Sequence, residues 1–471
     1  MNDKLYFFLA IILLFIIFFV QNISVAKDNQ SLRILGLREC VVLAIKNDPD
    51  IINTQDQIGI GRIRTDEALI SLLMPRFDLE TTRGPQLDFF GNPTSNNIFI
   101  NSASFEKPIY TGGRLMANYR MGQSETLKAQ HDYMQKVVEV TGGMMENYYR
   151  LLASQETVKY YQEVYDRAKK AVELLRKKYE AGAVMQLEVL EAEEKVNEIN
   201  YRLIKAQADL QADTNSLYER IGWDSEENIH VVNEFPIKEL EGDIDTLFAN
   251  ALKYRPDLLY EKENLEFSRL KIKLNKSKEI PNLSLKGNYK LEGENWPGDN
   301  SEWAVMLNLS FSLYNSTISS SASQNQTYEN PVVPRSEDFD FDVENLKLSL
   351  FDGSSNRVKM EEARADLKLS SNRLSQLKRS LRREVSDSFH ELQKAEATIK
   401  TAEKSIKIAE EKLKILEEKQ KLGLTTDIEI LDAEMELVDF KVRHIQAFYD
   451  KSVAIADLYK ATGTELAWKE N

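Results

Sequence analysis

The chain has 471 residues, of which 29% are charged, a formal net charge of −14 and a mean hydropathy of −0.42. So acidic a chain lacks the basic surface that phosphate contacts require, which disfavours nucleic acid as a partner. The single cysteine, Cys40, excludes a disulfide framework and a cysteine-based zinc site. We expect Cys40 to be a small buried hydrophobe on a helix, because free cysteine is commonly buried.

The N-terminal segment has the pattern of a secretory signal peptide. Lys4 precedes sixteen apolar residues, Leu5 to Val20, and the small residues Ser24 and Ala26 stand before a cleavage site. A membrane-spanning helix is the alternative, but it needs about 20 apolar residues. We therefore expect residues 1–26 to be removed. No later apolar run approaches that length, so the mature protein is predicted to be soluble outside the cytoplasm or to cross a membrane as strands.

The first repeat is predicted over 27–222. A helical pattern breaks at Asp48-Pro49, and a second helix ends at Pro75, where alternation from Phe77 begins. A turn-rich loop separates this strand from a second one. A very long helix then covers 114–181, breaks at Gly182, and is followed by a helix that closes near Gly222. At ~1.5 Å per residue the long helix measures about 100 Å.

The second repeat, over 223–471, has the same order. Arg255-Pro256 and Pro281 mark helix boundaries, and Trp303 to Leu313 alternates strictly between apolar and other residues. A long helix covers 354–422, with a break at Gly423. The Ser/Asn-rich and then acidic segment 315–345 has no counterpart in the first repeat. Either Trp303 to Leu313 is the returning strand and 315–345 a protruding insertion, which we favour, or the strand over 346–351 returns.

The two repeats indicate an internal duplication. Residues 182–222 align with 423–463 without a gap at a separation of 241, and 12 of the 41 positions are identical. Both long helices also carry a heptad seam, spaced alternately by three and four residues. In the second repeat the seam consists of Leu392, Ala395, Ile399, Ala402, Ile406, Ala409, Leu413 and Leu416.

The strands set a requirement for assembly. We predict four strands per chain. Four strands cannot close into a barrel, and an open sheet edge is not tolerated in lipid. The smallest membrane barrels have about 8 strands. The simplest symmetric solution is a homotrimer, with a 12-stranded β-barrel continuous with a long α-helical coiled-coil barrel. The predicted fold class is thus a mixed α and β membrane protein with an internal duplication.

At this point the chain resembles the TolC-type outer-membrane efflux proteins. The resemblance rests on the Asn47-Asp48-Pro49-Asp50 and Tyr254-Arg255-Pro256-Asp257 boundaries, the helix-proline-strand junctions, the segment PIYTGGRL from Pro108 and the paired glycine-centred phrases. It implies a trimeric, passive channel in the outer membrane of a Gram-negative bacterium that extends into the periplasm. It implies as partners outer-membrane lipid, a periplasmic adaptor and an inner-membrane transporter, and as cargo small molecules or proteins.

The resemblance also implies roles for the two glycine-centred phrases. They become the periplasmic tips of two hairpins, with adaptor docking at Gly182, Ala183, Val184, Gly423, Leu424 and Thr425. Acidic residues six and nine positions after the second glycine ring the closed entrance in the family. Here these are Glu429 and Asp432, with Glu188 and Glu191 as first-repeat counterparts. The competing interpretation of these acids is an ordinary solvated helix face.

Other classes of protein fit the sequence less well. The four histidines, His131, His230, His390 and His444, are not at metal-ligand spacing, so we expect no catalytic site, metal or cofactor. A periplasmic adaptor has one hairpin between two halves of a small β-domain, whereas this chain has two hairpins. A secreted coiled-coil structural protein does not need the alternating strands. An adaptor or structural protein remains the alternative to the channel.

Overall fold

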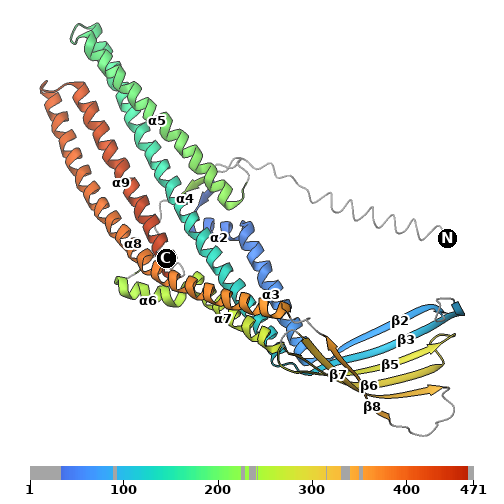
Figure 1. Ribbon diagram of the computed structural model, residues 1–471. Helices are drawn as coiled ribbons and strands as arrows, with labels where there is room; N and C mark the ends of the chain where they lie inside the picture. Colours follow the sequence, from blue (N-terminus) through green and yellow to red (C-terminus); the bar gives the residue numbers. More distant parts are fainter. Residues whose placement is uncertain are drawn as a thin grey trace, which may run out of the picture.

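The structure is a computed structural model, and it describes residues 33–87, 93–223, 229–232, 240, 242–313, 316–329, 340–349 and 354–464. Two pairs of long helices extend from one end of the molecule and an antiparallel sheet lies at the other (Figure 1). The predicted signal peptide, 1–26, lies outside the described residues. Among the helices of the described part, none has an apolar stretch long enough to cross a membrane.

The long helices confirm the heptad prediction. α4 (Arg114–Glu180) has 67 residues and α8 (Ser354–Lys421) has 68, each within one residue of the predicted end. α5 (Gln186–Ile221) and α9 (Asp427–Thr462) follow them. Along the seam of α8, every residue with an apolar side chain is buried or half-buried, including Ala395, Ile399 and Ala409. We call α4–α5 the first hairpin and α8–α9 the second hairpin; α9 packs against both α8 and α4.

The shorter helices break at the predicted prolines. α2 (Leu37–Asn47) precedes α3 (Pro49–Leu73), and α6 (Ile244–Tyr254) precedes α7 (Pro256–Ser277). Each proline takes the first position of its helix, where its missing N–H is not needed. Asp48 also caps α3, since its Oδ1 accepts hydrogen bonds from Asp50 N and Ile51 N at 2.9 and 3.0 Å.

Each repeat ends against its own proline boundary. Gly222, after α5, faces Asn47, whose Nδ2 donates to the carbonyl of Ile221 at 2.7 Å. Gly463, after α9, faces the backbone of Tyr254 and Arg255, at the corresponding boundary of the second repeat. Both glycines are left-handed, with φ of 70° and 65°. The predicted correspondence between the two repeats therefore extends to the packing of their closing glycines.

The core lies where the repeats meet. Buried side chains of α2, α4, α5, α6, α8 and α9 surround Tyr148, whose hydroxyl donates to Val232 O at 2.7 Å. This hydroxyl lies beside the parallel pair of β1 (Arg33–Leu35) and β4 (Ile229–Val231). The predicted burial of Cys40 is confirmed. A second cluster joins the two hairpins nearer their tips through Val164, Leu175, Ile199 and Leu431.

The predicted mixed α and β fold with long helices is confirmed, but within the described residues the sheet has six strands, so the count of four per chain, and of twelve in a trimer, is wrong. The order is β2 (Arg76–Leu87), β3 (Pro93–Tyr110), β5 (Asn282–Gly293), β6 (Asn300–Leu313), β7 (Ser316–Glu329) and β8 (Asp340–Ser349). The favoured placement of the returning strand is wrong too, because β8, not β6, precedes α8. β7 escaped detection because serine and other polar residues occupy both of its faces, which removes the period-2 hydrophobic signal.

One face of the sheet is apolar and open to the surroundings. The pairing register aligns Phe77, Phe105, Gly287 and Val305 across β2, β3, β5 and β6. The next rung aligns Leu79, Ala103, Tyr289 and Trp303. Phe77 and Leu79 are 72% and 86% exposed. The opposite face is polar, and there Lys286 Nζ lies 3.3 Å from Glu106 Oε2. Such a sheet suits apolar surroundings on one side and water on the other.

Candidate functional site: the hairpin tips

The two hairpins turn by the same hydrogen-bonded motif. In the first, Ala183 N donates to Lys178 O at 2.8 Å and Gly182 N to Tyr179 O at 2.9 Å. In the second, Leu424 N donates to Lys419 O and Gly423 N to Gln420 O, both at 2.9 Å. This is the Schellman pattern, which needs a left-handed residue after the helix. Gly182 and Gly423 supply it with φ of 75° and 71°. The prediction that these glycines make the turns is confirmed.

The second hairpin starts its return helix with a capping box. Thr426 Oγ1 accepts a hydrogen bond from Glu429 N, and Glu429 Oε2 accepts one from Thr426 N, both at 3.2 Å. The Thr425 hydroxyl also donates to the Glu429 carboxylate. These hydrogen bonds lower the pKa of Glu429, so it is ionised at neutral pH. The predicted gate residue thus serves as a helix cap within its own chain.

The first hairpin has only half of this cap. Met185 N donates to Glu188 Oε1 at 3.3 Å, but the methionine side chain offers no oxygen to the helix in return. Glu191, one turn further along α5, is exposed. Glu188 and Glu429 therefore occupy equivalent cap positions, and the second hairpin has the more complete set of hydrogen bonds.

Asp432 lies against a base of the other hairpin. Lys195 Nζ, in α5, is 3.1 Å from Asp432 Oδ1, in α9. The hydrogen bond with Asp432 and the charges of Asp432 and Glu198 raise the pKa of Lys195, so its ammonium is present at neutral pH. Within one chain, Asp432 is thus paired across the hairpins.

Three further acids of α9 pair with the first hairpin. Lys178 Nζ lies 2.7 Å from Asp427 Oδ2, Arg167 Nε lies 3.3 Å from Glu434 Oε1, and Arg202 Nη1 lies 2.7 Å from Asp439 Oδ1. The side chains of Asp427 and Glu434 are only 11% and 10% exposed, so these two pairs are better shielded from water than an ordinary surface ion pair. The Gln420 amide also donates to Asp427, which ties α8 to the same point.

Glu434 is the least solvated of these acids. Burial raises its pKa, the charge of Arg167 opposes the shift, and Glu417 adds to it. Its Oε2 atom is buried without a hydrogen-bond partner among the described residues. A carboxylate held this way costs free energy at neutral pH, which makes the contact between the hairpins sensitive to protonation.

The bases of these pairs were missed by the sequence reasoning. Lys178 and Asp427 are 249 residues apart, and Arg202 and Asp439 are 237 apart. Each base also sits in a helix rich in charge, so nothing in its local pattern distinguishes it. The only signal in the sequence was the series of acids along α9, and their basic partners lie on other helices.

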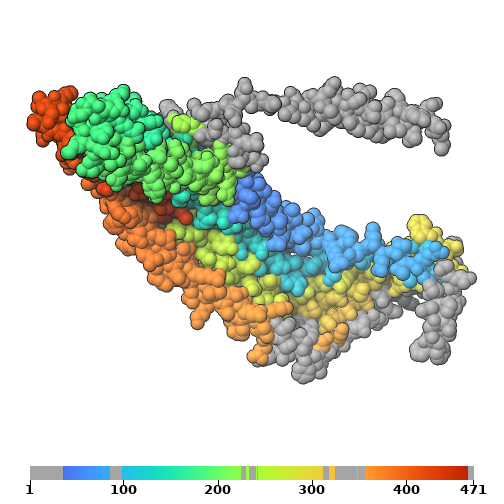
Figure 2. Space-filling view, turned by 90° about the horizontal axis from the view of Figure 1, so that it is seen from above, coloured from blue at the N-terminus to red at the C-terminus, as the bar shows by residue number. Residues whose placement is uncertain are grey.

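The tips expose apolar side chains. Leu422 and Leu424 are 73% and 71% exposed, and Met185 and Leu187 of the first hairpin are also exposed. Of the other predicted docking residues, Ala183 is exposed, whereas Val184 is half-buried against the cluster between the hairpins. Figure 2 shows both hairpins ending at the same end of the molecule.

The four histidines, His131, His230, His390 and His444, lie in α4, β4, α8 and α9. The described part contains no group of three potential ligands placed to hold a metal.

Comparison with known proteins covers most of the chain. The model of a family described as outer membrane efflux protein matches residues 67–223 and 316–464, more than half of the sequence. The alkaline protease secretion protein AprF of Pseudomonas aeruginosa is 23% identical over 169 residues, which is 36% of this chain and 35% of AprF.

Several solved structures share the fold. The CmeC outer membrane channel of Campylobacter jejuni superposes with a TM-score of 0.74 and 16% identity over 92% of this chain and 87% of that one. CusC gives a TM-score of 0.71 and 15% identity over 93% and 92%. The open-state MtrE outer membrane channel of Neisseria gonorrhoeae gives 0.69 and 14% over 91% and 88%.

Proposed function

The chain belongs to the outer membrane efflux protein family, and we propose that it is the outer-membrane channel of a tripartite efflux or type I secretion system. It acts as a passive homotrimeric conduit, opened when a periplasmic adaptor and an inner-membrane transporter dock. Outer-membrane lipid surrounds it, and exported small molecules or proteins pass through it. AprF, a secretion protein by name, supports the secretion branch of this proposal.

One observation carries the proposal. A sheet with an exposed apolar face lies at one end of the molecule, and two duplicated helical hairpins extend from it to glycine turns at the other end (Figure 1). The apolar face suits the outer membrane, which directs the hairpins into the periplasm. Neither a globular enzyme nor a periplasmic adaptor requires both features in one chain.

We place the gate at the tips. Three-fold symmetry would gather three copies of Glu429 and Asp432 around one axis, with Glu188 and Glu191 on the other hairpins. Like charges collected there repel, so the closed tip needs opposing contacts. We assign this role to the pairs that tie the hairpins together, Lys195–Asp432 and Lys178–Asp427. In this scheme Asp432 has two roles in the closed tip: it contributes negative charge near the axis, and it pairs with Lys195 of the first hairpin.

We place adaptor docking on the tip surface. Leu424, together with Gly423 and Thr425 and the first-hairpin residues Gly182, Ala183 and Val184, offers a small apolar surface at the end of the molecule. An adaptor that binds this surface only when the hairpins have separated would shift the population towards the open state.

Planar-bilayer recording of the purified protein tests the proposal. A channel predicts an outer-membrane location, a trimer that dissociates on heating in gel electrophoresis, and discrete conductance steps. Release as a soluble periplasmic protein without conductance would contradict the channel and favour the alternative, a coiled-coil structural or adaptor protein.

A further inference from the structure

A cavity of about 430 Å³ lies between α4, α7 and α8, far along the chain from the hairpin tips. α4 contributes His131 and Asp132, α7 contributes Tyr260 and Glu261, and α8 contributes Arg373 and Leu377. The volume falls within the range of small-molecule sites, roughly 300–1,000 Å³. Nothing in the proposed gate or docking surface uses it.

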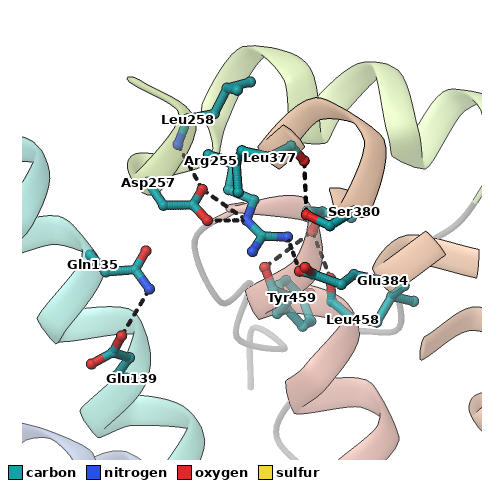
Figure 3. Close-up of polar contacts among 11 residues, drawn as sticks. Gln135, Glu139, Arg255, Asp257, Leu258, Leu377, Ser380, Glu384, Leu458 and Tyr459 are labelled. Carbon is teal, nitrogen blue, oxygen red and sulfur yellow. Dashed lines mark hydrogen bonds and ion pairs between the residues drawn. The ribbon is translucent and has the colours of Figure 1, made fainter. Parts of the chain in front are cut away.

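One wall of this cavity is fixed by a buried arginine. Arg255 Nε donates to both carboxylate oxygens of Asp257, at 2.9 and 3.0 Å, and Arg255 Nη1 lies 2.5 Å from Glu384 Oε2 (Figure 3). The Arg255 side chain is 11% exposed. Because Asp257 also accepts from Leu258 N at 2.7 Å, its carboxylate is fully engaged. These contacts hold the wall together, and the carboxylates of Asp257 and Glu384 share the single guanidinium of Arg255.

The opposite wall has unused polar groups. His131 Nδ1 is buried without a hydrogen-bond partner among the described residues, which is costly for a polar atom. Burial lowers the pKa of His131, against the charge of Glu263, so the ring is neutral at neutral pH. Asp132 also lines the cavity; its charge acts on Lys136, but no ion pair within the described part has Asp132 as a partner.

The hydroxyl of Tyr260 lies near the charged side chains that line the cavity. Burial raises its pKa, the charges of Asp132 and Glu261 add to the shift, and the charge of Arg373 opposes it. The phenol therefore keeps its proton, and these three charged side chains lie close enough to act on it. Among the lining residues, the carboxylates of Asp132, Asp257 and Glu261 outnumber the single guanidinium of Arg373, so the lining is net negative. Lys136 and Lys128, outside the lining, interact electrostatically with Asp132 and Glu261.

We propose that this cavity binds a small organic ammonium ion with an apolar body. The carboxylate of Asp132 would pair with the ammonium, whose N–H groups also suit the orphaned Nδ1 of His131. The Tyr260 ring offers an aromatic face to a cation, and Leu377 offers apolar contact to the body of the ligand. An anion would meet the carboxylates of Asp132 and Glu261 and be repelled.

Three probes of equal size and different charge test the ligand class. Benzylammonium, benzyl alcohol and benzoate are titrated calorimetrically against the purified trimer in detergent at neutral pH. We expect benzylammonium to bind and benzoate not to bind. Absence of benzylammonium binding, or equal binding of benzoate, would overturn the proposal.

Variants locate the binding within the cavity. Asp132→Asn should weaken the affinity for benzylammonium about tenfold, because a charge-assisted hydrogen bond is replaced by a neutral one. Glu266→Gln removes the same charge from an exposed position of α7, paired with Arg269 at 3.3 Å, and should change affinity less than about twofold. Equal effects of the two variants would show a general charge effect and exclude the site.

Thiol labelling tests whether the cavity is open in the assembled protein. Asp132→Cys should react with a cationic thiosulfonate, and benzylammonium should slow the reaction. The background is low, because burial raises the pKa of Cys40 to about 12. An unlabelled Asp132→Cys trimer would show that a neighbouring copy fills the cavity, which refutes the ligand site.

Discussion

The ammonium of Lys195 lies 3.1 Å from the carboxylate of Asp432, and this contact joins the first hairpin to the second close to their tips. Asp432, a predicted gate residue, therefore has a second role. Asp432 contributes negative charge near the entrance and at the same time holds the hairpins together. Separate substitutions of Lys195 and Asp432 distinguish these two roles.

Lys195→Met removes the tie and leaves the acid in place. We expect a several-fold rise in mean conductance of the reconstituted channel, with cation preference unchanged or increased, because Asp432 is freed. Lys412→Met is the control, since Lys412 pairs with Glu436 at 2.5 Å within the second hairpin. Equal conductance of the two variants would contradict the role of the Lys195–Asp432 pair in holding the hairpins together.

Glu429→Ala combined with Asp432→Ala removes both predicted gate acids. We expect cation preference to fall and conductance to change, because up to six carboxylates would leave the axis of a trimer. The reversal potential in a salt gradient measures this directly. Ion selectivity like that of the unmodified channel would contradict the assignment of these residues to the gate.

Leu424→Glu places a charge on the exposed tip. Export should be abolished while folding and trimer formation are retained, since Leu424 is 71% exposed and contributes little to the core. Export of a native cargo or a dye, with trimer assayed on a gel, measures both. Lys404→Glu on the exposed face of α8, well away from the tip, is the control. Continued export by Leu424→Glu would move the docking site elsewhere.

Gly463→Ala and Gly423→Ala compare two left-handed glycines. Both substitutions place alanine in a left-handed conformation, which costs roughly 1–2 kcal/mol. A Cβ at Gly463 would also lie 2.4 Å from the Arg255 Cα, whereas nothing lies within 4 Å of one at Gly423. We expect Gly463→Ala to be the more destabilising by about 2 kcal/mol or more in denaturant unfolding. Similar unfolding midpoints would contradict this close packing.

Glu434→Gln tests the pH dependence of the contact between the hairpins. Burial raises the pKa of Glu434 above its ordinary value of 4.5, so its protonation favours the folded state. Its contribution to stability is therefore complete below about pH 4.5 and is lost as the pH rises through the folded pKa. The unfolding midpoint of the unmodified protein should fall more over this range than that of Glu434→Gln. The control Glu391→Gln, on the exposed face of α8, should behave like the unmodified protein.

The strong repeating patterns made much of the fold predictable. A seam of spacing three and four predicted the two long helices, and the glycine breaks placed their ends within one residue. The prolines placed the boundaries of the short helices. All of these signals are local. β7 was missed because its order comes from pairing with β6, where Leu307 faces Ala322 and Leu309 faces Ser320, and its own sequence lacks alternation. The turn glycines were predictable for a local reason, whereas Lys195 and Lys178 depend on tertiary packing.

The ion pairs of α9 also bear on a ring of three copies. They make the boundary between the two hairpins of one copy different from the boundary between neighbouring copies. Acids stand 241 residues before Asp432, Glu434 and Asp439 as well, at Glu191, Glu193 and Glu198. Two of the three bases do not recur, because the counterpart of Lys195 is Glu436 and that of Arg167 is Ile408, whereas Arg202 has Arg443 as its counterpart. The boundary between hairpins of one copy therefore differs chemically from the boundary between neighbouring copies. Six hairpins in a ring would alternate between two kinds of groove, and a partner protein would encounter each kind three times.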